Sequence, residues 1–195
     1  MNTGKEKPYR IVDLEQGTEA WHEWRDNGLG ASDAPALMGE NPWKSRAKLL
    51  HEKRLRLRPP VNRSMARGTG LEPIARRSYE RATGTTVYPV CLQSSTVEWL
   101  RASVDGLSAD GGSVVEIKCG ESVYRKAAST RRVPTYYVGQ LQHILAVTGL
   151  AEIDFWCFLP QRPEVHLSVQ RNERYIEKLL AAEEKFWQEL QKGMS

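Results

Sequence analysis

The sequence predicts an α/β domain in which helices flank a central mixed β-sheet. Three observations support this fold class. Hydrophobic residues recur at helical spacing in the first part of the chain, short β-branched runs replace them in the middle, and helical spacing returns at the end. A chain of 195 residues can form one domain with a substantial core and is short for two. We therefore expect a single domain over residues 1–195.

The first part of the chain is expected to form helices over residues 18–28, 30–39, 45–57 and 70–84. Trp21 and Trp24 lie on one face of the first helix, and Gly28 ends it. Ser32 has the side chain of a natural N-cap for the second helix. The segment RLRPPVNR separates the third helix from the fourth and is the clearest break in the chain.

The remainder of the chain alternates between short strands and helices. Three β-branched runs bounded by turn residues predict strands over residues 85–93, 97–105 and 113–119. A mostly apolar helix over 134–149, two further strands over 152–160 and 164–170, and an amphipathic helix over 171–192 follow. The last helix is expected to pack on the domain.

The strand over residues 113–119 carries an acid and a base on one face. Residues two apart in a strand point to the same side, so Glu116 and Lys118 share a face, and Ile117 lies on the opposite, apolar face. The segment GLSADGG predicts a turn that brings Asp105, at the end of its strand, close to Glu116. This spacing alone is more typical of an ordinary hairpin with charges on its solvent face.

The same residue types could also hydrolyse a phosphodiester bond. Two divalent cations about 4 Å apart can activate a water molecule and compensate the charge of the leaving oxygen. Mg²⁺ prefers oxygen ligands, and a lysine can orient the attacking water. Glu72, expected in the first turn of its helix, is the candidate for a third acid. Its alternative role is compensation of the helix dipole.

Charge and cysteine content narrow the class of protein. The net charge is +4, and nine residues from Lys44 to Arg67 are Lys or Arg. Such a cluster favours a polyanion such as nucleic acid, with a solvated helix face as the alternative. Three widely separated cysteines argue against a disulfide framework or a zinc ribbon. Without a secretion signal or a bilayer-spanning run, we expect a cytoplasmic protein with no membrane contact.

Five segments in order resemble the phage lambda exonuclease and YqaJ viral recombinase family of the PD-(D/E)XK nuclease superfamily. They are AWHEWRDNGLGASDAPALMG, ARGTGLEPIARRSYE, ASVDGL, VVEIKC and YYVGQLQHILAVTG. Val104 stands where the superfamily usually has a proline before the aspartate. The resemblance spans residues 17–150 and implies a single nuclease domain with a restriction-endonuclease-like core.

The resemblance also implies a role for each residue of the site. Two Mg²⁺ ions, for which Mn²⁺ is a plausible substitute, would be held by Asp105, Glu116, the Ile117 carbonyl and Glu72, and Lys118 would serve the nucleophilic water. Gln140 matches the active-site glutamine of the family. Gln142 is the rival assignment, because both glutamines face apolar helix neighbours and either could be a hydrogen-bonded core amide.

Residues Arg25 and Ser32 match positions that hold the 5′-terminal phosphate in this family. An arginine fork suits phosphate, and a helix N-terminus is an anion site. A surface arginine and a plain N-cap are the alternatives. Met65 falls where the family places an apolar wedge that helps to part the strands, although a methionine is more often part of a core.

The function implied by the resemblance is that of a Mg²⁺-dependent, processive 5′→3′ exonuclease. It would degrade one strand of double-stranded DNA from 5′-phosphorylated ends and leave 3′ overhangs for phage recombination. A homotrimeric ring, a single-strand annealing partner and a phage or prophage origin in a bacterial cell are further implications. The alternatives are a structure- or site-specific endonuclease of the same fold, and a catalytically retired module that binds DNA ends.

Overall fold

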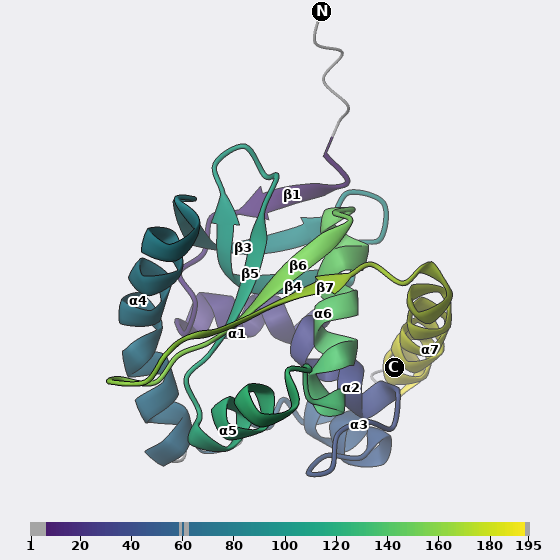
Figure 1. The fold of residues 1–195 in the computed structure, drawn as a ribbon. Coiled ribbons are helices and arrows are strands. Elements are labelled where there is room, and N and C mark those ends of the chain that lie inside the picture. Colours follow the sequence, from purple (N-terminus) through teal and green to yellow (C-terminus); the bar gives the residue numbers. More distant parts are fainter. Residues whose placement is uncertain (1–6, 59, 61–62, 194–195) are drawn as a thin grey trace, which may run out of the picture.

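A seven-stranded sheet forms the centre of the computed structural model, which describes residues 7–58, 60 and 63–193 (Figure 1). The strands are β1 (Tyr9–Val12), β2 (Leu29–Gly30), β3 (Val87–Ser94), β4 (Leu100–Ser108), β5 (Val114–Lys118), β6 (Glu152–Cys157) and β7 (Val165–Gln170). Their order is β1-β3-β4-β5-β6-β7, with β2 paired to β4. Because β2 runs parallel to β4 and β5 parallel to β6, while the other neighbours are antiparallel, the predicted mixed sheet is confirmed.

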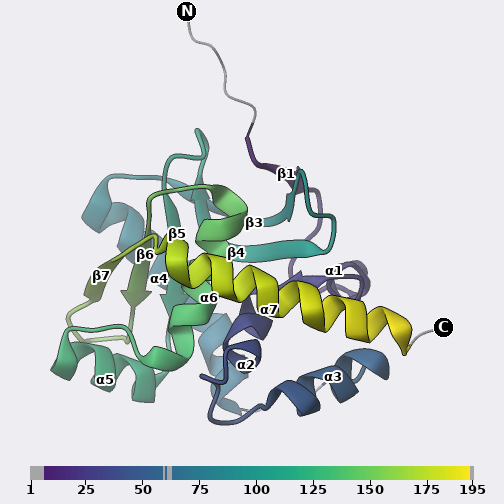
Figure 2. The same ribbon diagram turned by 90° about the vertical axis from the view of Figure 1, so that its right-hand side faces the viewer.

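Helices cover both faces of this sheet. They are α1 (Glu19–Asp26), the 3-10 turn η1 (Ala31–Asp33), α2 (Ala34–Leu37), α3 (Arg46–Arg54), α4 (Arg63–Thr83), α5 (Glu121–Thr130), α6 (Thr135–Thr148) and α7 (Glu173–Lys192). Helix α4 packs on one face and α6 on the other, and α7 crosses α6 and α2 to reach α3 (Figure 2). Within the described part of the chain, no helix is both long and apolar enough to span a membrane.

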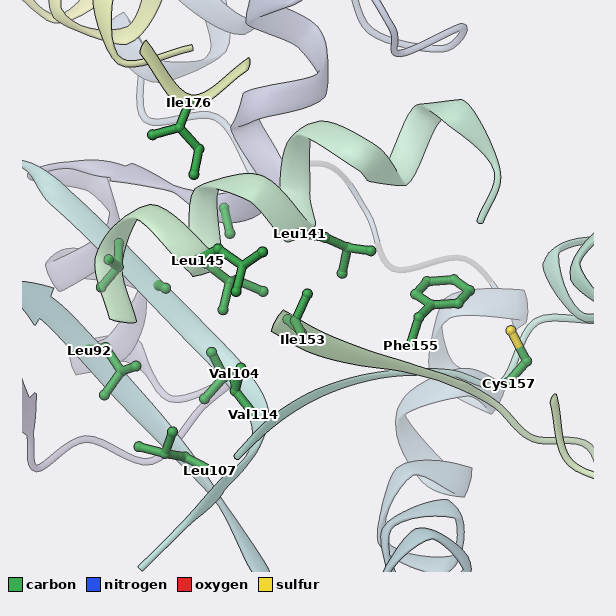
Figure 3. Packing of buried hydrophobic residues seen from close by; sticks show 14 of the residues in the cluster. Leu92, Val104, Leu107, Val114, Leu141, Leu145, Ile153, Phe155, Cys157 and Ile176 are labelled. Carbon is green, nitrogen blue, oxygen red and sulfur yellow. The ribbon is translucent and has the colours of Figure 1, made fainter. Parts of the chain in front are cut away.

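The main core lies between the sheet and α6. Leu141 and Leu145 of α6 point toward Val104, Val114 and Ile153 on the sheet (Figure 3). Full burial of one such side chain contributes roughly 1.5–3 kcal/mol to folding. The opposite face of β5 also carries the predicted apolar residues, and they pack under α4 in a second cluster. Strand β5 is therefore buried on both sides, and any charge it carries has to be matched locally.

A buried ion pair ties α7 to α6. His143 Nδ1 of α6 lies 2.6 Å from Glu183 Oε1 of α7, and its Nε2 lies 2.8 Å from the Arg101 carbonyl oxygen. Both side chains are fully buried. Burial alone would lower the pKa of His143, but the Glu183 carboxylate outweighs it and raises that pKa.

Three sequence-based expectations differ from the structure. Strand β4 does not end at Asp105 but continues to Ser108, and the turn follows. Helix α4 begins at Arg63, so Glu72 lies in its interior and cannot compensate a helix dipole at the N-terminus. Ser32 is not an N-cap, because it lies within η1 and the Asp33 carboxylate takes the Gly30 N–H instead.

Three elements that were not predicted are β1, β2 and α5. Strand β2 has only two residues and exists through parallel pairing with β4, which is distant in the sequence. Helix α5 follows β5 directly and buries Val123, Tyr124 and Ala127. Its hydrophobic residues are few, so helical periodicity is weak in the sequence ESVYRKAAST.

A β-bulge places Asp105 in the sheet. Val90 of β3 pairs with Val104, whereas Tyr88 pairs with Leu107, so Asp105 and Gly106 together lie opposite Pro89. An extra residue of this kind bends the strand and re-aims a side chain. Proline has no N–H to donate to a neighbouring strand, and bulges are among the few places in a sheet that accept it.

We expect Gly106→Ala to destabilise the protein. A Cβ atom at Gly106 would lie 2.6 Å from Val87 Cγ2 and 2.7 Å from Val115 Cγ1, so the bulge has no room for a methyl group. Overpacking of this kind costs about 1–3 kcal/mol of unfolding free energy, measurable by urea denaturation. Gly70→Ala in α4 is the matched control, because a Cβ there has no neighbour within 4 Å and should stabilise the helix by roughly 0.5–1 kcal/mol. Equal effects of the two substitutions would contradict this account of the bulge.

Candidate active site

Most of the predicted site residues line one pocket of about 300 Å³. The three acids Glu72, Asp105 and Glu116 share this pocket with Gln140, Arg25 and Ser32. Helices α1, α4 and α6 and strands β4 and β5 therefore each bring at least one polar side chain to the same place. Two groups that are far apart in the sequence, the acids and the Arg25–Ser32 pair, thus face the same cavity.

Asp105 is fixed by two backbone contacts at the bulge. Its Oδ2 accepts a hydrogen bond of 2.7 Å from the Ile117 N–H, across the β4–β5 pair. Its carbonyl oxygen accepts another of 2.7 Å from Arg76 Nε of α4. Burial raises the pKa of the Asp105 carboxyl, while Lys118 and the Ile117 hydrogen bond oppose that rise.

Glu116 lies at the centre of the polar cluster. Its side chain is almost fully buried, and Oε1 accepts hydrogen bonds of 2.5 Å from both Lys118 Nζ and Gln140 Nε2. Its second oxygen, Oε2, is buried and has no hydrogen-bond partner among the described residues. A buried carboxylate oxygen without a donor is costly, and a bound cation would relieve that cost.

The crowding of the acids shifts their proton affinity. Burial raises the pKa of Glu116 to about 7, with a further contribution from Asp105, and Lys118 opposes it. Burial also raises the pKa of Glu72 to about 7, again with Asp105 adding to the effect. For Lys118, burial favours the neutral amine, but Glu116 and Asp105 outweigh it and raise the pKa, so the lysine stays charged. One lysine therefore faces three carboxyl groups.

The carboxylate oxygens of the site are of the type that binds a hard divalent cation. In the described ranges, no three His, Cys, Asp or Glu side chains form a group that could hold a metal ion as they lie. In this arrangement Lys118 and Gln140 donate to Glu116 Oε1, and the Ile117 N–H donates to Asp105 Oδ2. The oxygens of Asp105 and Glu116, with Glu72 in the same pocket, are nevertheless the type that Mg²⁺ prefers.

The structure separates the two candidate glutamines. Gln140 reaches Glu116 and lines the pocket. Gln142 is buried elsewhere, where its Nε2 donates to the Gln170 carbonyl at 2.9 Å and its Oε1 accepts from the Asn172 N–H at 2.8 Å. Gln142 is thus a hydrogen-bonded core amide that joins α6 to the start of α7. Met65 lies in α4, but its side chain is outside the described residues.

Arg25 and Ser32 form a direct contact on the pocket wall. Arg25 Nη2 donates to Ser32 Oγ at 2.7 Å, and the guanidinium group lies 4.6 Å from the centroid of the Trp21 ring. Trp21 in turn donates from Nε1 to Ser103 Oγ at 2.8 Å. The guanidinium also lies against Gly30, where a Cβ would be in van der Waals contact with Nη2 at 3.4 Å. The guanidinium is thereby oriented by a hydroxyl and an aromatic face, and neither neutralises its charge.

Two contributors to the site escaped the sequence analysis. The Tyr137 ring lies 4.8 Å from Lys118 Nζ, a cation–π contact. The position of Tyr137 three residues before Gln140 on one helix is a signal that could have identified it. Gln16 lies in a loop and donates to the carbonyls of Val104 at 3.0 Å and Val90 at 3.4 Å, next to the bulge. No sequence pattern points to this residue.

Four of the nine basic residues between Lys44 and Arg67 form ion pairs within the protein. Ion pairs join Lys44 to Glu52, Arg46 to Glu189, Lys53 to Asp33, and Arg58 to Glu19 and Asp26. These ion pairs join α3 to α7 through Arg46 and to η1 through Lys53, and they join the segment after α3 to α1 through Arg58. The cluster as a whole is a weaker indication of a nucleic-acid surface than its sequence suggested.

Comparison with known proteins gives consistent matches. The family model of the YqaJ-like viral recombinase domain matches residues 20–151. The YqaJ protein of Bacillus subtilis (strain 168) is 25% identical over 193 residues, which cover 95% of this chain and 60% of that protein. The chain thus spans less than two thirds of that relative.

Solved structures share the fold. The alkaline exonuclease LHK-Exo of Laribacter hongkongensis is similar with a TM-score of 0.81 and 28% identity, covering 91% of this chain and 94% of that one. Its complex with dAMP has a TM-score of 0.79 and 26% identity over the same shares. A phage related exonuclease from Haemophilus somnus 129PT, at 16% identity and a TM-score of 0.60 over 86% and 96% of the two chains, shows the fold alone. The family model matches most of the chain, and the motifs that carried the resemblance contribute the side chains of the pocket. This chain therefore belongs to the YqaJ-like viral recombinase domain family.

Proposed function

We propose that the protein is a Mg²⁺-dependent 5′→3′ exonuclease that degrades one strand of double-stranded DNA from 5′-phosphorylated ends. The observation that carries the proposal is the single pocket that contains the acids, with Lys118 bound to Glu116, and also the Arg25–Ser32 pair. A phosphate bound at Arg25 and a phosphodiester beside the acids would belong to the same DNA strand. The similar LHK-Exo is described as an alkaline exonuclease and has been solved with dAMP, which supports a nucleotide product.

In this proposal two Mg²⁺ ions occupy the acidic part of the pocket, and Mn²⁺ could replace them. Asp105, Glu116, the Ile117 carbonyl and Glu72 would hold the ions. The unpartnered Glu116 Oε2 and the raised pKa values of Glu72 and Glu116 support a cation there. Bound metal would supply an activated water and charge stabilisation at the phosphate.

The other residues proposed for the site would position the water and the DNA. Lys118 stays protonated beside Glu116, and its ammonium can orient the attacking water and the developing charge. Gln140 fixes the same Glu116 oxygen from α6. Arg25 and Ser32 would bind the terminal phosphate by a charge-assisted fork and a hydroxyl, which sets the 5′ polarity.

Further parts of the proposal depend on family membership. They are processive action, 3′ overhangs as products, a homotrimeric ring around the DNA, a single-strand annealing partner, and a phage or prophage origin in the bacterial cytoplasm. Met65 is proposed as the strand-separating wedge. Light scattering tests the trimer directly, because a ring of three chains has three times the mass of the 22.1 kDa protomer.

We expect Lys118→Ala to reduce Mg²⁺-dependent digestion of an end-labelled linear duplex by roughly 10²–10³-fold, because removing one preorganised donor at a site of developing charge costs about that much. Lys126→Ala, which removes an exposed lysine on α5, is the matched control and should retain full activity. A closed circular duplex should remain intact with both proteins. Digestion of the circle would instead identify an endonuclease, and full activity of Lys118→Ala would refute the assignment of the site.

Mg²⁺ or Mn²⁺ should raise the Tm of the protein in the absence of DNA. Binding at 100 times Kd adds about 2.7 kcal/mol of stability, which corresponds to roughly 5–10 °C for a chain of this size. Protons compete with the metal for Glu72 and Glu116, whose pKa values are about 7, so the gain should be larger at pH 8 than at pH 6. Glu116→Gln should lose the gain, and Glu184→Gln on the exposed face of α7 should keep it. An identical Tm shift in Glu116→Gln would place the metal elsewhere.

Arg25→Ala should abolish the preference for 5′-phosphorylated over 5′-hydroxyl ends. A charge-assisted hydrogen bond is worth about 1.5–3 kcal/mol, so kcat/KM on phosphorylated ends should fall roughly 10–150-fold while hydroxyl ends change little. Steady-state digestion of two duplexes that differ only in the 5′ group measures the ratio. A preference that survives in Arg25→Ala would rule out the phosphate pocket.

A further inference from the structure

We propose that Lys53 and Asp33 are positioning residues that determine the selectivity of the pocket for a terminal phosphate. They would hold the segment from Arg25 to Ser32 in place and keep the charge of Arg25 available to the ligand. Neither residue lines the pocket, and neither was among the site residues named from the sequence. The inference rests on the proposed binding of a 5′-phosphate at Arg25 and Ser32.

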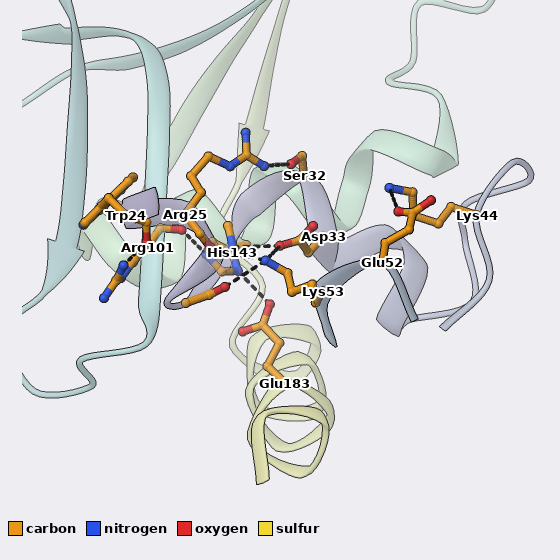
Figure 4. Close-up of polar contacts among 12 residues, drawn as sticks. Trp24, Arg25, Ser32, Asp33, Lys44, Glu52, Lys53, Arg101, His143 and Glu183 are labelled. Carbon is orange, nitrogen blue, oxygen red and sulfur yellow. Dashed lines mark hydrogen bonds and ion pairs between the residues drawn. The ribbon is translucent and has the colours of Figure 1, made fainter. Parts of the chain in front are cut away.

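Lys53 reaches from α3 behind the pocket wall and binds three oxygens. Its Nζ lies 2.8 Å from the Gly28 carbonyl, 3.4 Å from the Arg25 carbonyl and 3.0 Å from Asp33 Oδ2 (Figure 4). An ammonium group has three protons to donate, so this arrangement uses all of them. The two carbonyls belong to the end of α1 and the turn after it, which fixes the point where the chain leaves α1.

Asp33 holds the other end of the same segment. Its Oδ2 accepts a 3.0 Å hydrogen bond from the Gly30 N–H and so caps η1, the turn that carries Ser32. Asp33 and Lys53 are nearly buried, with 10% and 11% of their side chains exposed. Between the anchored Gly28 and Asp33 lie only Leu29, Gly30, Ala31 and Ser32, so Arg25 and Ser32 have little freedom to move apart.

The charge of this pair also matters for the ligand. Burial raises the pKa of Asp33, but Lys53 and Arg25 outweigh burial and the net pKa is lowered, so the carboxylate is ionised. A buried carboxylate behind an anion pocket would repel a phosphate and attract the Arg25 guanidinium. Lys53 matches this charge, and Arg25 can point to Ser32 instead. A terminal phosphate monoester carries about −1.5 to −2 charges and an internal diester only one, so loss of this balance should affect terminal phosphate most.

The test compares binding of two duplexes that differ only in a 5′-phosphate or a 5′-hydroxyl, measured by fluorescence anisotropy in EDTA so that no cleavage occurs. We expect Lys53→Met to reduce the ratio of the two affinities about tenfold. Lys53→Met combined with Asp33→Asn removes both charges and should recover part of the ratio. Lys48→Met removes an exposed lysine from the same helix and should match the wild type.

Several outcomes would overturn the inference. One is that folded Lys53→Met keeps the wild-type ratio of affinities for the two duplexes. Another is that the double variant has the same ratio as Lys53→Met, since a purely structural role of Lys53 predicts no rescue by Asp33→Asn. If Lys53→Met does not fold, as judged by thermal melting, the double variant alone decides: a wild-type ratio there refutes the role of the pair, and a reduced ratio supports it. Wild-type protein that binds both ends equally also overturns the inference. Wild-type protein that prefers phosphorylated ends but cleaves no DNA would refute only the exonuclease proposal.

Discussion

The position of Asp105 depends on one irregularity in the sheet, the bulge that sets two residues of β4 against Pro89 of β3. A regular strand would continue to alternate its side chains, whereas the extra residue changes which face Asp105 and the residues after it address. Val104 before the bulge and Leu107 after it both face the core under α6, although they are three residues apart. Two side chains bind the backbone at the bulge: Gln16 donates to the Val104 carbonyl, and Arg76 of α4 donates to the Asp105 carbonyl.

The cluster around Glu116 follows from the burial of β5 on both faces. A carboxylate in such a strand loses its water, and here it gains one amine and one amide donor on the same oxygen. The other oxygen has none among the described residues. The site is therefore ordered but lacks a positive charge or donor for the second Glu116 oxygen. A cation bound there would add to the stability of the folded protein.

The sequence predicted the α/β class, the mixed sheet and most elements, because long apolar helices and β-branched strands have strong periodic signals. It did not predict β2, which requires a partner seventy residues away, or the bulge, which depends on how β3 and β4 align. Ser32 was expected to be an N-cap because its side chain suits that role. In the structure it is the Asp33 carboxylate that accepts a hydrogen bond at the start of η1, from the Gly30 N–H. Of the residues named from the resemblance, Glu72, Asp105, Glu116 and Gln140 line one pocket in the structure, and Lys118 contacts Glu116. Gln16 and Lys53 were missed, since supporting contacts of this kind arise from tertiary packing and leave no spacing pattern in the chain. Tyr137 was missed although its helical spacing from Gln140 was available as a signal.

The buried pair of His143 and Glu183 has a consequence for recognising active members of this family. Every motif that carried the resemblance, and the whole of the matched family segment, ends before Glu183. Yet His143 lies on the same helix as Gln140, one turn further along, and has its charge matched from α7. A gene truncated after the last motif would thus still be identified as encoding a recombinase domain, while its product would carry an unmatched imidazole beneath the helix that orients Glu116. In this chain the motifs therefore do not include every residue that supports the helix of Gln140, because Glu183 of the last helix pairs with His143 from outside the matched segment.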